Sequence, residues 1–581
     1  MSISILGLNF HHADASACLL IDGKLIAAVA EERFSRIKRD SSFPINSIKN
    51  VLSYANLKFD DIDYIAYSRD ESANYFNKLL YGIKNFNTAF EAFKEHKRRE
   101  SDTKKLEVKI ANLLGIECFK NKTKLIKVEH HLCHGCSSYF NSNFDKSLVF
   151  NSDASGDFVS MSIYLGVGNK LKLLDKTFLP NSLGMFYSAM TQLIGFKGYG
   201  DEFKLMGLSA YGENVYYDFL KKIFIKNNKG LIKTRKGYIN MHSGGKSGKK
   251  TSSETIKTEI LFSKKLEDFF GPPPNDCKNP GNREKNIASS TQKLFEELTL
   301  NKIKKYSHYS ENISLAGGCS LNGLVNTRIA EDLGLNNQFV QPASTDDGTA
   351  IGAAFYVWNI FLNKRSRFYM ENCFLGIEYG LTKSDLKYIE KKNYKIVEHC
   401  SVDSTINSAA LAISNNEVIG WFQGRSEWGP RALGNRSILT NPANPNAKEL
   451  INRKIKRRES FRPFAPSVLD EFVQNYFETN LTSPFMNHVV KVRKEFIDIL
   501  KATTHVDGSA RIQTVNKKNN PLYYKLINKV KSYTKFPIVL NTSFNENEPI
   551  VEKPMEAFAT FERTKMDRVY IGNIEVRRNK D

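Results

Sequence analysis

Two segments of the chain share a pattern of strand, polar turn and strand, and this repeated pattern restricts the fold more than any other feature. Residues 3–8 and 17–30 are predicted to form strands, and Asp22-Gly23 between two apolar runs predicts a hairpin turn. Residues 148–164 repeat the arrangement around an acidic turn that begins at Asp153. Strands of this kind, separated later in the chain by helical patterns, predict a mixed α/β protein.

The length of 581 residues is too great for one hydrophobic core, so we expect two or three domains, with a boundary near residue 368. Hydrophobic residues make up 41% of the chain and charged residues 25%, as in soluble globular proteins. The sequence has no run of 18 apolar residues, which argues against a membrane span. The first residues lack a basic segment before an apolar one, so they predict a strand rather than a signal peptide.

Eight cysteines are scattered without a disulfide pattern, which favours reduced thiols and a cytoplasmic location. Cys133 and Cys136 have the spacing of half a zinc site or a redox pair. The sequence has no second Cys-x-x-Cys, so we expect these two side chains to pack in the core.

The formal charge of +22 is compatible with nucleic acid, an anionic surface or phosphorylated substrates. Much of the excess lies in the lysine-dense stretches 94–105 and 226–257. Lysine-dominated runs are usually solvated surface, so we expect neither a nucleic-acid nor a membrane partner.

Two histidines and two aspartates have the pattern of a metal site. His130 and His134 are four residues apart, which places both imidazoles on one face of a helix. Asp153 and Asp346 lie in loops that follow β-like runs. Together they would form a mixed nitrogen and oxygen site suited to Fe(II), Mn(II) or Zn(II). The alternative is a pair of buried histidines held only by hydrogen bonds.

A glycine pair follows the helical stretch 284–310. Residues 313–326 are predicted to form a strand, a turn at Gly317 and Gly318, and a helix. Such a turn lets backbone amides and a helix N-terminus approach a phosphate, although close packing would explain the glycines equally well.

The stretch 424–469 is rich in arginine. Gly, Pro and Asn lie between the arginines, so the arginines do not share one helix face. The seven arginines are Arg425, Arg431, Arg436, Arg453, Arg457, Arg458 and Arg462. Guanidinium groups on rigid turns indicate an anion pocket, and interdomain salt bridges are the alternative. Residues 537–545 are predicted to form a strand that enters a polar loop beside the same pocket.

These blocks occur together with several others along nearly the whole chain. They are His11-His-Ala-Asp-Ala-Ser, Glu31-Glu-Arg-Phe-Ser-Arg-Ile-Lys, His130-His-x-x-His, Asp153-x-Ser-Gly-Asp, Gly200-Asp-Glu-Phe-Lys-Leu-Met-Gly, Leu315-Ala-Gly-Gly-Cys-Ser-Leu-Asn, Gly424-Arg-x4-Gly-Pro-Arg-Ala-Leu-Gly-Asn-Arg, Lys456-x-Arg-Glu-x-Phe-Arg-Pro-Phe-Ala-Pro and Asn541-Thr-Ser-Phe-Asn. The chain thereby resembles the NodU/CmcH-type O-carbamoyltransferases, which modify nodulation factors, antibiotics and toxins.

The resemblance implies two domains. Residues 1–368 would form an ASKHA (actin-like ATPase) domain similar to the tRNA threonylcarbamoyl-transferring enzyme, and residues 369–581 a YrdC-like domain. The YrdC-like domain would make carbamoyl-adenylate and pyrophosphate from carbamoyl phosphate and ATP with Mg²⁺. The ASKHA domain would then transfer the carbamoyl group to a hydroxyl of a small-molecule or sugar acceptor. The enzyme would be a monomer or a homodimer.

The resemblance also implies roles for individual residues. Arg431, Lys456 and Arg462 would neutralise charge during adenylate formation. The other residues of the adenylate-forming site would be Arg458, Arg511, Asn541 and Ser543. The nucleotide cleft of the first domain would be lined by Glu202, Lys204, Gly317, Gly318 and Asn322. Glu202 would accept ribose hydroxyls, whereas Lys204 is equally compatible with a local ion pair. The metal at His130, His134, Asp153 and Asp346, Fe²⁺ before Mn²⁺ or Zn²⁺, would withdraw charge from the leaving phosphate.

His12 is the expected general base for the acceptor hydroxyl, because an imidazole titrates near neutral pH. His11 is the competitor, since neighbours on a strand face opposite sides. The chain departs from the family at Arg39, where many relatives have histidine, and at Gly271-Pro-Pro-Pro, where relatives often carry arginine.

Two other functions fit parts of the pattern. A tRNA threonylcarbamoyl-type enzyme that binds RNA would use the positive charge, but the arginine-rich blocks argue against it. A non-catalytic actin-like scaffold would need neither Arg431 nor Arg462.

Overall fold

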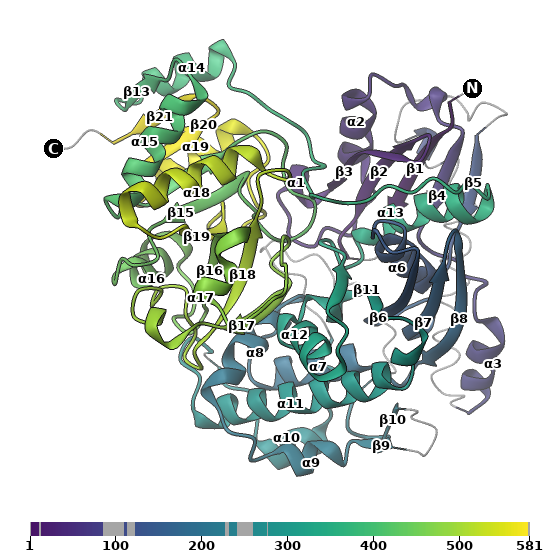
Figure 1. The fold of residues 1–581 in the computed structure, drawn as a ribbon. Coiled ribbons are helices and arrows are strands. Elements are labelled where there is room, and N and C mark those ends of the chain that lie inside the picture. Colours follow the sequence, from purple (N-terminus) through teal and green to yellow (C-terminus); the bar gives the residue numbers. More distant parts are fainter. Residues whose placement is uncertain are drawn as a thin grey trace. The chain divides into compact units, whose positions relative to one another are not determined.

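The computed structural model describes residues 2–10, 13–84, 108, 110–112, 123–226, 232–240, 259–275 and 277–578. The predictions for His11, His12, the stretch 94–105 and most of 226–257 therefore lie outside the described residues. The chain forms two compact units (Figure 1). Unit 1 comprises Met1–Leu321 and Arg328–Met370, and unit 2 comprises Asn322–Thr327 and Glu371–Asp581.

The N-terminal segment of unit 1 forms a five-stranded sheet with the order β3-β2-β1-β4-β5. Its strands are β1 (Ser4–Asn9), β2 (Ser16–Ile21), β3 (Lys24–Ala30), β4 (Tyr64–Tyr67) and β5 (Lys124–Lys127). β1 runs antiparallel to β2 and parallel to β4. The predicted strands and the turn at Asp22-Gly23 are confirmed, and both turn residues have a positive φ.

A second sheet of unit 1 repeats this topology with the order β12-β11-β6-β7-β8. Its strands are β6 (Lys146–Gly156), β7 (Val159–Val167), β8 (Lys170–Phe178), β11 (Asn312–Ala316) and β12 (Asn337–Val340). β6 pairs antiparallel with β7 and parallel with β11, as β1 pairs with β2 and β4. The β6–β7 register shifts between Ser152 and Gly156, so the acidic turn forms an irregularity in the ladder.

Helices α6 and α13 pack against these two sheets. The α-helices of unit 1 with described bounds are α1 (Glu32–Ser35), α2 (Ile45–Tyr54), α3 (Tyr75–Lys84), α6 (His130–Tyr139), α7 (Leu183–Leu193), α8 (Glu202–Leu208), α9 (Tyr217–Lys221), α10 (Lys264–Phe270), α11 (Asn282–Lys304) and α13 (Gly348–Phe355). α12 (Gly323–Leu333) begins in unit 2 and ends in unit 1. Every residue of α13 is buried, and the helix lies against α6, β1 and β2.

Unit 2 contains a nine-stranded mixed sheet with the order β13-β21-β20-β14-β15-β19-β16-β18-β17. Its strands are β13 (Lys395–Glu398), β14 (Ile419–Phe422), β15 (Arg436–Thr440), β16 (Ala465–Leu469), β17 (His488–Lys491), β18 (Ser509–Val515), β19 (Ile538–Ser543), β20 (Arg568–Ile571) and β21 (Ile574–Arg577). The helices are α14 (Lys383–Glu390), α15 (Val402–Ser414), α16 (Ala447–Leu450), α17 (Val473–Tyr476), α18 (Pro521–Thr534) and α19 (Pro554–Arg563).

Helices cover both faces of this sheet. Trp421 packs in one hydrophobic cluster with α15 and α18, whereas the adjacent Phe422 packs in another cluster with α19. Neighbouring strand residues point to opposite faces, so the two clusters are the two sides of one three-layer arrangement. Within the described ranges, no helix combines the length and the apolar character that crossing a membrane requires.

Candidate functional site

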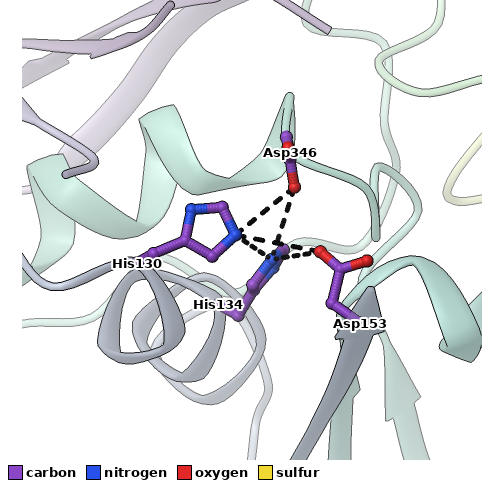
Figure 2. A group of neighbouring side chains, drawn as sticks. All are labelled: His130, His134, Asp153 and Asp346. Carbon is purple, nitrogen blue, oxygen red and sulfur yellow. Dashed lines mark hydrogen bonds and ion pairs between the residues drawn. The ribbon is translucent and has the colours of Figure 1, made fainter. Parts of the chain in front are cut away.

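Three elements of unit 1 bring His130, His134, Asp153 and Asp346 together (Figure 2). The two histidines lie on consecutive turns of α6, whose N-terminus is capped by the Glu129 carboxylate. Asp153 comes from the irregular turn at the end of β6, and Asp346 lies just before α13. Both imidazole side chains are fully buried, and both carboxylates are nearly so.

The spacing of the four ligand atoms fits one metal ion. The two histidine Nε2 atoms are 3.1 Å apart. Asp153 Oδ2 lies 3.3 Å from Nε2 of His134 and 3.8 Å from that of His130, and Asp346 Oδ1 lies 3.4 and 3.8 Å from the Nε2 atoms of His130 and His134. Ligands about 2.1 Å from a tetrahedral zinc-like ion would be about 3.4 Å apart. These four side chains can therefore hold a divalent cation.

Electrostatics within the cluster favour charge pairing. Burial opposes the charged form of His130, but Asp346 and Asp153 outweigh it and raise its pKa well above the usual value. Burial also opposes ionisation of Asp153, yet hydrogen bonds from the two histidines hold its pKa well below the usual value. A divalent cation would replace the imidazolium charge that these carboxylates otherwise attract.

The cysteines beside this cluster do not take part in it. Cys133 and Cys136 are free thiols buried on α6, and Cys133 Sγ donates to the carbonyl oxygen of Val128 at 3.6 Å. The expectation that these two side chains pack in the core is confirmed.

The glycine pair lies directly against the candidate metal ligands. A Cβ on Gly317, whose φ is +86°, would come within 2.2 Å of the Ser152 carbonyl oxygen. A Cβ on Gly318 would lie 3.1 Å from Asp153 Oδ1. Close packing of backbone on β6 therefore explains Gly317, while Gly318 leaves room beside the Asp153 carboxylate.

The remaining nucleotide-cleft predictions have local partners in the structure. Ser188 donates a hydrogen bond of 2.5 Å to Glu202, and burial raises the pKa of Glu202. Lys204 forms an ion pair of 3.1 Å with Asp201, which is the alternative that the sequence left open. The side chain of Asn322 accepts the amide of Val325 in the first turn of α12.

Arg39, which the sequence marked only as a departure from the family pattern, forms a polar group with Asp14 and Thr345 close to the cluster. Arg39 Nη1 donates to Asp14 Oδ2 at 2.6 Å and to Thr345 Oγ1 at 3.4 Å. Burial raises the pKa of Asp14 to about 7; Arg39 lowers it, and Asp347 adds to the increase. The signal available in the sequence was Arg39 itself, because it departs from the family pattern.

Three arginines of unit 2 share one small region. Burial and the charges of Arg462 and Arg511 lower the pKa of Arg458 well below its usual value. Burial and Arg462 lower the pKa of Arg511 to about 10. Among the residues that the structure describes, the buried atoms Arg458 Nη2 and Arg511 Nε have no hydrogen-bond partner. Glu459 pairs with Arg462 at 3.5 Å and balances one of the three charges. The remaining positive charge favours an anion in this region.

Other arginines of this region hold loops in place. Arg436 is fully buried, stacks on Phe422, and donates to backbone carbonyl oxygens at 2.7–3.1 Å. Arg425 donates to the carbonyl oxygens of Leu375 and Gly376, both at 2.7 Å. Arginine density alone did not separate these structural side chains from Arg458 and Arg462.

Lys456 and Asn541 are also engaged with the protein. The Lys456 ammonium donates to Ser543 and Asn545, with contacts of 2.5–3.2 Å to four oxygen atoms. The Asn541 amide donates to the carbonyl oxygen of Ala432 at 3.2 Å, next to Arg431 in the chain. The loop 541–545 and the loop that carries Arg431 are therefore adjacent in unit 2.

Two family models match the sequence. "Carbamoyltransferase N-terminus" matches residues 4–355, and "Carbamoyltransferase C-terminus" matches residues 410–578. The chain belongs to the carbamoyltransferase family. This carbamoyltransferase is 36% identical to protein sll1178 of Synechocystis sp., over 98% of this chain and 96% of the relative. It is 34% identical to the nodulation protein NolNO of Sinorhizobium fredii, over 98% of this chain and 79% of the relative.

A shorter similarity links the carbamoyltransferase to the 3'-hydroxymethylcephem-O-carbamoyltransferase of Amycolatopsis lactamdurans, at 31% identity over 45% of this chain and 47% of the relative. Among solved structures, HypF of T. kodakarensis matches 62% of this chain and 48% of its own length, with 13% identity and a TM-score of 0.30. The carbamoyltransferase thus spans about half the length of HypF.

Proposed function

We propose that this carbamoyltransferase forms carbamoyl-adenylate from carbamoyl phosphate and ATP in a YrdC-like domain, residues 369–581. An ASKHA-type domain, residues 1–368, then transfers the carbamoyl group to a hydroxyl of a small-molecule or sugar acceptor. The observation that carries the proposal is the convergence of Arg458, Arg462 and Arg511, whose mutual repulsion an anionic substrate would relieve. The two sheets of identical topology in unit 1 support the ASKHA assignment.

The arginine pocket suits the chemistry of adenylate formation. Water releases inorganic phosphate from carbamoyl phosphate and leaves carbamate. A carbamate oxygen then attacks the α-phosphorus of ATP, and the bond to the pyrophosphate oxygen breaks. Guanidinium groups neutralise charge on the transferring phosphoryl group, which is the main contribution a protein makes to such a step. Arg431 completes the pocket, and Lys456 orders the loop that contains Ser543.

In the transfer step an acceptor hydroxyl attacks the carbamoyl carbon, and AMP leaves. His130, His134, Asp153 and Asp346 would hold a divalent ion, Fe²⁺ before Mn²⁺ or Zn²⁺, which supplies Lewis-acid stabilisation of the leaving phosphate. His12 is the proposed acceptor of the hydroxyl proton. Gly318 leaves space for the nucleotide beside Asp153.

The test is pyrophosphate release from ATP with and without carbamoyl phosphate. We expect release only when carbamoyl phosphate is present, and we expect Arg462→Ala to slow it by about 100-fold, equivalent to roughly 3 kcal/mol. Arg453→Ala is the matched control, because Arg453 is in the same segment but its side chain is 79% exposed. Formation of ADP without any AMP species would contradict the adenylate mechanism.

A further inference from the structure

We propose that Asp157 is a positioning residue for the metal site, and that its carboxylate fixes helix α6 to the turn that carries Asp153. This inference rests on the metal site of the proposed function. Asp157 is not among the four candidate ligands, but it lies in the same turn as Asp153.

The carboxylate of Asp157 connects three segments. Its Oδ2 atom accepts the backbone amide of His130 at 2.9 Å and the backbone amide of Asp70 at 2.9 Å. Its carbonyl oxygen accepts the side-chain amide of Asn74 at 3.0 Å. One carboxylate oxygen therefore ties the first residue of α6, which is itself a candidate ligand, to the segment after β4.

The preceding residue supports the imidazole of His130. A Cβ on Gly156 would come within 2.0 Å of His130 Cδ2 and 2.2 Å of Cγ. The ring therefore lies directly on the Gly156 backbone, and no larger residue fits beneath it. The turn therefore contacts His130 at two points: Asp157 binds the His130 backbone amide, and Gly156 packs against the His130 ring.

The Asp153 side of the same turn is held by α7. Ser182 donates to the carbonyl oxygen of Ala154 at 2.7 Å, and a Cβ on Gly184 would come within 2.7 Å of the Asp153 backbone. With Asp153 held there, the Asp157 hydrogen bond sets where His130 and His134 lie relative to it. Loss of a group that orients a metal ligand typically weakens metal binding by about 10- to 100-fold.

The experiment is a titration of the full-length, metal-free protein with Co²⁺, in which the dissociation constant and the visible d–d spectrum are measured. We expect Asp157→Ala, which removes the oxygen that accepts both amides, to weaken Co²⁺ binding by about 10-fold or more and to change the spectrum. Gly156→Ala should have the same effect, because its methyl group would displace the His130 ring.

Glu129→Ala is the matched control. The Glu129 carboxylate accepts the Leu132 amide at the same end of α6 but is outside the Asp153 turn. We expect this variant to keep the wild-type spectrum and to bind Co²⁺ within about threefold of wild type, although its melting temperature should be lower than that of wild type.

Equal Co²⁺ affinity and an unchanged spectrum in folded Asp157→Ala would overturn the positioning role and leave the metal site standing. Wild-type protein that binds no Co²⁺ would overturn the metal site and the positioning role together. If Glu129→Ala and Asp157→Ala lose affinity equally and keep the wild-type spectrum, the effect is one of helix stability, and the proposal fails.

Discussion

At the scale of single residues, burial controls the charge of Asp14. Burial raises the pKa of Asp14 to about 7. The nearby charge of Asp347 also raises this pKa, whereas Arg39 lowers it. In the unfolded chain an aspartate titrates near pH 4, so between about pH 4 and 7 the native state binds more protons than the unfolded state. The free energy of unfolding should therefore fall as the pH rises through this window.

We predict that Asp14→Asn flattens this pH dependence, by at most about 4 kcal/mol between pH 4 and 8. The measurement is the urea midpoint of metal-free protein at several pH values. Asp145→Asn serves as the control, because Asp145 is exposed in the same unit. An unchanged slope in Asp14→Asn would show that Asp14 does not take up the proton.

At the scale of elements, one buried carboxylate shapes the loop that carries Arg431. Glu427 is 3% exposed, and its Oε1 atom accepts the amides of Leu433, Asn435 and Arg436 at 2.7, 2.9 and 3.2 Å. Hydrogen bonds to a charged group are worth about 1.5–3 kcal/mol each, so the loop conformation depends on this side chain.

We predict that Glu427→Gln destabilises unit 2 by about 2 kcal/mol and raises the KM for carbamoyl phosphate. Calorimetry and pyrophosphate release measure the two effects. Glu449→Gln is the control, since the Glu449 side chain is 74% exposed and pairs only with an exposed arginine in the described structure. A normal KM in Glu427→Gln would separate the loop from substrate binding.

At the scale of the whole molecule, the two candidate sites belong to different units. All four candidate metal ligands lie in unit 1, and the clustered arginines lie in unit 2. We predict that His134→Ala loses carbamoyl transfer by about 100-fold or more but retains pyrophosphate release that depends on carbamoyl phosphate. Arg462→Ala should lose both activities, because transfer consumes the adenylate.

Separate assays of pyrophosphate and carbamoylated product, with an acceptor found by mass spectrometry, measure this difference. Equal loss of both half-reactions in folded His134→Ala would contradict separate sites. Treatment with a chelator, followed by Mg²⁺ to restore ATP binding, should reproduce the His134→Ala behaviour in wild-type protein.

Local patterns in the sequence determined much of the fold and of the metal site. The spacing of His130 and His134 predicts one helix face, and alternating apolar runs with a turn at Asp22-Gly23 predict the first strands. These features depend on residues a few positions apart. They can therefore be predicted from a single sequence.

Only the tertiary structure decided which charged side chains converge and which hold the protein together. Arg436 and Arg458 both belong to the arginine-rich stretch 424–469, yet one is stacked in the core and the other is close to Arg462 and Arg511. The hydrogen bonds of Asp157 to Asp70 and His130 span 87 and 27 residues. Such contacts depend on how distant strands and helices pack, and no local periodicity encodes that packing.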